Sequence, residues 1–69
     1  MVEVFRTNVM SADASEMLLG KLAARLPDCR LNFDLDDCDK ILRAEGETVD
    51  AAAVIELVKA DGFECELLD

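Results

Sequence analysis

The stretch from Cys29 to Leu35 alternates strictly between apolar and polar residues. Its odd-numbered positions hold cysteine, leucine, phenylalanine and leucine, and its even-numbered positions hold arginine, asparagine and aspartate. Successive side chains of a β-strand point to opposite faces, so this pattern predicts a strand with one buried and one wet face. The chain should therefore contain a sheet that is covered on one side only.

Two elements are predicted before this strand. Residues Val2 to Val9 are rich in β-branched and aromatic types, which favours a first strand. The run Asp13-Ala14-Ser15-Glu16 has the spacing of a helix N-terminus, and Pro27 marks the end of that helix. Its apolar residues recur at helical intervals, at Met17, Leu18, Leu22 and Leu26.

Three more elements are predicted after it. Residues 36–39 have turn composition, so the strand Lys40 to Glu45 should form a hairpin with the alternating strand. Asp50 can cap a helix that runs to Ala60, with Val49 and Val54 as a hydrophobic staple. Gly62 suits the left-handed residue that ends a helix, and Phe63 to Leu67 alternates as a last strand.

The resulting order is βαββαβ in a single domain over residues 1–69. With short connections and right-handed crossovers, this order predicts the ferredoxin-like α+β fold. The expected sheet is antiparallel with strand order 4-1-3-2, and both helices pack on one face. Cys29 and Cys65 should then lie at opposite edges of the sheet, too far apart for a disulfide or a shared metal ion.

Acidic residues dominate the second half of the chain. The formal net charge is −9, and residues 34–69 carry twelve acidic and three basic side chains. Such a charge repels phosphate backbones and anionic lipids, so we expect neither nucleic acid nor membrane as a direct partner. A basic protein or a second copy of the chain remains a candidate partner. The candidate interaction surface consists of Asp36, Asp37, Asp39, Glu64 and Glu66.

The remaining residues predict neither catalysis nor a resident cofactor. The chain has no histidine, and its three cysteines have no C-x-x-C spacing. An odd cysteine count and the absence of a signal-peptide pattern favour a cytoplasmic location. Carboxylates gather in one turn, at Asp34, Asp36, Asp37 and Asp39, but the sixth position of a calcium-loop reading is Asp39 instead of glycine. A solvated turn is the favoured interpretation, and a weak cation loop is the alternative.

Three segments resemble the heavy-metal-associated domain of copper chaperones and metal-transport ATPases. They are the strand and loop Phe5-to-Met10, the strand Asn32-Phe33-Asp34-Leu35, and the ending Gly62-Phe63-Glu64-Cys65-Glu66-Leu67. In that family two cysteines of an M-x-C-x-x-C loop hold the metal. The corresponding positions here are Val9, Met10, Ser11 and Ala14, and no cysteine precedes Cys29. The resemblance therefore implies the fold without a thiolate metal site, and no metal ligand is carried over.

Three functions are compatible with these observations. The first is a non-catalytic relative of the heavy-metal-associated domain that acts through protein contacts. The second is a metal-binding or metal-transport domain with unorthodox ligands, although carboxylates do not replace thiolates for a soft ion. The third is a regulatory module similar to ACT domains, which share this topology and bind small ligands such as amino acids.

Overall fold

A computed structural model describes residues 1–36 and 38–68 of the chain. It contains two helices and four strands in the order βαββαβ. Their bounds are β1 (Val2–Thr7), α1 (Ala12–Arg25), β2 (Arg30–Asp34), β3 (Ile41–Glu45), α2 (Ala51–Ala60) and β4 (Cys65–Leu68). The first and last strands are shorter than expected, because Asn8 and Val9 belong to a loop and the chain around Phe63 is still turning away from α2.

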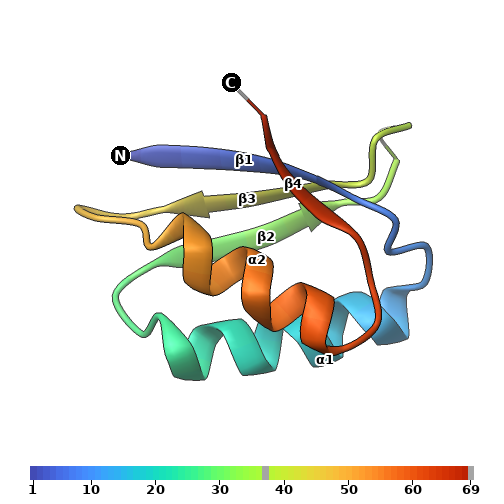
Figure 1. The fold of residues 1–69 in the computed structure, drawn as a ribbon, viewed down its shortest axis with the longest axis horizontal. Helices are drawn as coiled ribbons and strands as arrows, with labels where there is room; N and C mark the ends of the chain where they lie inside the picture. The colour runs from blue at the N-terminus through green and yellow to red at the C-terminus, as the bar shows by residue number, and fades with distance from the viewer. Residues whose placement is uncertain (37, 69) are drawn as a thin grey trace.

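The four strands form one antiparallel sheet in the order β2-β3-β1-β4. This is the predicted order 4-1-3-2 counted from the other edge, so the ferredoxin-like α+β fold is confirmed. Both helices lie on the same side of the sheet, and the opposite face carries no helix (Figure 1). No helix among the described residues is long and apolar enough to cross a membrane.

Helix α1 is capped two residues before the predicted capping residue, Asp13. Its N-cap is Ser11, whose extended backbone lets the side-chain oxygen accept a hydrogen bond from the Ala14 N–H at 3.1 Å. Asp13 instead lies in the first turn, where its negative charge interacts favourably with the positive end of the helix dipole. Met17 points toward solvent with 47% exposure, while Leu18 and Leu22, four residues apart on one face, are fully buried.

Helix α2 matches its prediction closely. The Asp50 side chain accepts from the Ala53 N–H at 3.1 Å, and both staple residues, Val49 and Val54, are buried. The helix ends before Gly62, whose φ of +92° is the left-handed conformation that a side chain would strain. This turn reverses the chain and lays β4 against the sheet beside α2 (Figure 1).

The core fills the space between the sheet and the two helices. Its largest fully buried side chains come from every element except β2 and β4, and they are Phe5, Leu18, Leu22, Leu42, Val9, Val54 and Val58. Cys65 is 5% exposed and belongs to this core, as expected. Cys29 is only half-buried at the margin, where its thiol donates to the Thr48 carbonyl at 3.5 Å.

Candidate functional site

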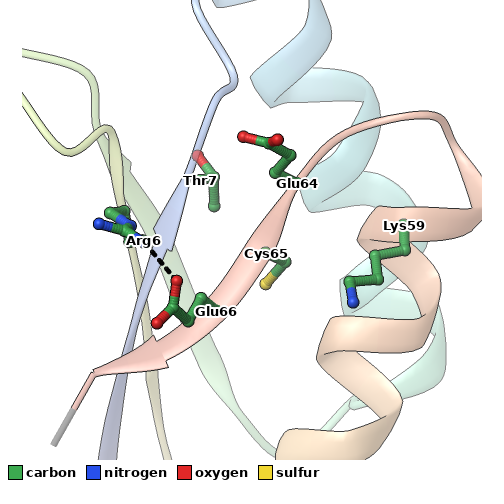
Figure 2. Close-up of a pocket in the computed structure, with 6 residues that line it drawn as sticks. All are labelled: Arg6, Thr7, Lys59, Glu64, Cys65 and Glu66. Carbon is green, nitrogen blue, oxygen red and sulfur yellow. Dashed lines mark hydrogen bonds and ion pairs between the residues drawn. The ribbon is translucent and has the colours of Figure 1, made fainter.

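A cavity of about 430 Å³ opens where strand β4 passes α2 at the edge of the sheet. The end of β1 and the start of β4 supply most of its walls, and the last turn of α2 supplies one basic side chain. Its lining residues are Arg6, Thr7, Lys59, Glu64, Cys65 and Glu66. Figure 2 shows Lys59 extending from α2 toward β4, while Arg6 and Glu66 meet on the other side of the strand.

Two hydrogen bonds donated by backbone N–H groups hold the residues just before β4 in place. The Phe63 N–H donates to the Val58 carbonyl at 3.3 Å, which keeps the turn after α2 attached to that helix. The Glu64 N–H donates to the side-chain oxygen of Asn8 at 2.8 Å, which ties the next residue to the loop after β1. The cavity therefore depends on the Gly62 turn, since that turn sets β4 between these two anchors.

Successive N–H groups at β4 point alternately toward β1 and away from it. The Glu64 N–H points toward the β1 side and the Phe63 N–H points away from it. Because N–H groups alternate sides along a strand, Glu66 continues the inward series and faces its register partner Arg6. The N–H and C=O groups of Cys65 and Leu67 therefore point outward, and no described residue bonds to them.

The register of the other strands supports this assignment. The Met1 carbonyl accepts from the Gly46 N–H at 3.0 Å, so odd-numbered residues of β1 turn their amides toward β3. Even-numbered residues of β1 then face β4, as the Arg6–Glu66 pairing requires. The outer side of β4 is thus an unpaired sheet edge that borders the cavity.

Charges at the cavity are partly paired. The Arg6 guanidinium forms a salt bridge with the Glu66 carboxylate. Among the described residues, neither the Lys59 ammonium nor the Glu64 carboxylate has a hydrogen-bond or ion-pair partner. One cationic and one anionic group are therefore free to meet a ligand, one on each side of the edge strand (Figure 2).

The cavity also contains a thiol of low reactivity. Burial raises the pKa of Cys65 from 9.0 to about 11, and the nearby positive charge of Lys59 offsets only part of that effect. At neutral pH the thiol therefore stays protonated, and the protonated form is a poor nucleophile and a poor metal ligand.

We expect the pKa of Cys65 to make folding stability fall at high pH. Below pH 9 the thiol is protonated in both the folded and the unfolded chain, so it does not make the free energy of unfolding depend on pH. Between pH 9 and 11 the unfolded chain loses this proton first, so the free energy of unfolding decreases. Denaturant titrations across this range should give a shallower decline for Cys65→Ala than for the wild type. The exposed Cys38 gives the control, because Cys38→Ala should keep the wild-type slope.

The positions that correspond to the family's metal loop have structural roles here. Val9 is completely buried, Ser11 caps α1, and Ala14 is half-buried within that helix. Met10 is 78% exposed, and Cys29 and Cys65 belong to opposite edges of the sheet, so the two thiols cannot form a shared site with it. These residues do not fit a soft metal ion, and a buried valine and a capping serine occupy the loop instead.

Thr7 stabilises this loop from beneath. Its hydroxyl donates to the Lys40 carbonyl at 2.6 Å and accepts from the Val9 N–H at 3.2 Å. Its own N–H donates to the Asp39 carbonyl at 3.1 Å. The end of β1 is thereby joined to the turn before β3, with Thr7 7% exposed.

The predicted acidic surface is divided by β1. Asp36 and Asp39 are exposed in the turn between β2 and β3, and Asp34 lies on the helix-free face at the end of β2. Asp37 lies outside the described residues. Glu64 and Glu66 lie on the other side of β1, at the cavity. Within residues 1–36 and 38–68, no three of the acidic and cysteine residues are grouped so that they could hold a metal ion.

Sequence reasoning missed Arg6 and Lys59 as members of the site. Two features of the sequence could have indicated them. Arg6 and Glu66 are oppositely charged residues of the first and the last predicted strand, and Lys59 lies three residues before Gly62, which ends the second helix. Without the strand order, nothing shows that β4 pairs with β1 and passes α2.

No family model, curated protein or solved structure matches this chain.

Proposed function

We propose that the chain is a non-catalytic protein-binding module, a relative of the heavy-metal-associated domain whose thiolate metal site has been lost. The observation that carries this proposal is the unpaired edge of β4 beside the cavity. An unpaired edge offers a row of backbone donors and acceptors to another chain. Here the edge is short and flanked by Glu64 and Glu66, which limits unspecific pairing.

The chemistry of the cavity favours binding over catalysis. Its nucleophile, the Cys65 thiol, is held protonated by burial, and its other polar side chains are a threonine, two cations and two carboxylates. Carboxylates and cations of this kind recognise a charged partner through complementary charge. A net charge of −9 makes a basic partner the favoured one, because long-range attraction speeds its approach.

The helix-free face of the sheet is less suited to this role than the edge. Two of its basic side chains already have acidic neighbours across the strands: Arg30 lies opposite Glu45, and Arg6 is paired with Glu66, whereas Arg43 lies between Asn32 and Val4. Such cross-strand pairs are mutually stabilising in water. We therefore assign the binding function to β4 and its cavity.

The test combines a metal titration with a binding measurement. Anaerobic titration with Cu(I) and Zn(II) in the presence of a competing chelator, followed by native mass spectrometry, should leave the chain without stoichiometric metal. Proteins captured from the source cells should include a basic protein that, once purified, forms a defined complex with the chain. Stoichiometric metal that survives the chelator would favour the metal-handling alternative and contradict the proposal.

The unpaired Lys59 at the cavity favours one second candidate, an ACT-like module that binds a small ligand such as a free amino acid. The ammonium of Lys59 would face the ligand carboxylate. Thermal shifts with a panel of amino acids distinguish this candidate, since a protein-binding module should show none.

A further inference from the structure

We infer that the partner of this chain contributes an extended segment that adds as a fifth strand to the outer edge of β4, with basic and apolar side chains in alternation. This inference rests on the proposed function and specifies its partner. In strand addition, main-chain hydrogen bonds supply affinity and alternate side chains supply specificity.

The backbone of β4 provides the docking groups. The N–H and C=O of Cys65 and of Leu67 point away from β1 and have no partner among the described residues. These two residues are separated by one, which matches the two-residue repeat of hydrogen bonding in a β-ladder. An extended segment can therefore bond to both without any change in β4.

The two faces of the added strand would meet different surroundings. On the helix side, the half-buried Leu67 and the buried Cys65 line the edge and the Lys59 ammonium lies beside it, so the added strand should present apolar and not basic side chains there. On the helix-free side, Glu66 lies opposite its partner Arg6 of β1, and the side chain of Leu68 lies on the same face of β4. Glu64 begins that row with an unpaired carboxylate, so side chains of the added strand on this side should be basic.

Charge argues against a second copy of the chain as the occupant. An antiparallel register that pairs Cys65 with Leu67 of a second copy would place Glu66 directly opposite the second copy's Glu66. Like charges in directly opposed positions destabilise a strand pair. Each copy also carries a net charge of −9, so the two would repel at long range. A basic segment would be attracted to Glu66 at short range and to the acidic chain at long range.

The probe for this inference is a short synthetic peptide in which lysine alternates with valine, capped at both ends. Titration of the isotope-labelled chain, followed by amide NMR shifts, should perturb residues of β4 and the end of α2. An analogue with N-methyl groups at alternate backbone positions keeps the charge and the side chains but cannot pair with the edge. We expect it to bind at least roughly tenfold more weakly, since about one hydrogen bond is worth that factor and the methyl groups also clash.

Proline substitution tests the same edge from the side of the protein. Leu67→Pro removes an outward N–H, a position at which an edge strand tolerates proline. Leu31→Pro is the matched control, because Leu31 is also half-buried and its N–H faces outward from the opposite edge strand, β2. Peptide affinity should fall roughly tenfold for Leu67→Pro and stay unchanged for Leu31→Pro.

A second pair of variants separates local from overall charge. Glu64→Lys and Glu16→Lys change the net charge equally, and Glu16 is exposed on α1, away from the cavity. Both variants should weaken peptide binding through their equal change in net charge, and Glu64→Lys should weaken it further.

The outcomes distinguish this inference from the proposed function. Shifts confined to β2 or the helices, equal effects of both proline variants, or undiminished binding of the N-methyl peptide would each overturn strand addition at β4. The protein-binding function would still stand if a purified partner bound the chain. Conversely, stoichiometric metal binding would overturn the proposed function whatever the peptide does.

Discussion

Leu22→Ala should destabilise the protein by about 2–5 kcal/mol, the cost of removing a buried leucine and leaving a cavity. Leu22 is fully buried in the cluster that joins α1 to the sheet. A chain of this length has a total stability of roughly 3–10 kcal/mol, so the variant should be largely or wholly unfolded at the upper end of the range. Chemical denaturation followed by circular dichroism measures the change.

Met17→Ala is the matched control for this variant. It shortens an apolar side chain on the same helix, but Met17 is on the outer surface. Surface substitutions usually change stability by less than about 0.5 kcal/mol. Similar losses for Met17→Ala and Leu22→Ala would mean that the orientation of α1 is different from the one described.

The second large effect is expected for Thr7→Val. The substitution keeps the shape of the side chain but removes the hydroxyl that links the Lys40 carbonyl and the Val9 N–H. Leaving two polar backbone groups without their partner costs about 2–4 kcal/mol. The loss should appear as a lower denaturation midpoint, and amide hydrogen exchange of Val9 should accelerate more than that of β2.

Two further variants identify the cause of that loss. Thr7→Ser keeps the hydroxyl and should recover most of the stability, because only one methyl group is removed. Thr48→Val makes the same chemical change at an exposed position and should have little effect. If Thr7→Ser were as unstable as Thr7→Val, the hydroxyl would not be the source of the stabilisation.

The loop that resembles a metal-binding loop contributes to the stability of this fold. Ser11 now caps α1 and Val9 fills the core, so both positions contribute to stability. A C-x-x-C pair placed at Ser11 and Ala14 would therefore remove the cap of α1. This structural use gives a physical reason to look for function at the other side of the sheet, where β4 remains unpaired.

Local sequence signals were sufficient for most elements but inaccurate at their ends. The strict alternation around Phe33 placed β2, and Asp50 and Gly62 placed both ends of α2. The start of α1 was predicted too late, because Asp13 and Ser11 are both good caps and sequence alone does not show which one has the extended backbone. Met17 was wrongly assigned to the buried stripe, because a residue five positions before Leu22 lies off the face that Leu18 and Leu22 share.

The candidate site was less accessible to sequence reasoning. Glu64 and Glu66 were singled out for their charge and do lie at the cavity, whereas Asp36 and Asp39 are separated from them by β1. Arg6 and Lys59 were missed because their place in the site depends on which strand pairs with β4. Pairing partners distant in the sequence leave no local pattern in a single chain.

By itself, the sequence determined the identity and order of the elements and the face that each buries, because periodicity, caps and turns act over a few residues. The order βαββαβ with short connections then restricted the topology to the one observed. Only the tertiary structure decided which edge amides stay unpaired, which charges meet across β4, and where a cavity remains. Those features come from contacts between residues far apart in the sequence, such as Arg6 and Glu66 at a separation of 60 positions, and they exist only after the sheet has formed.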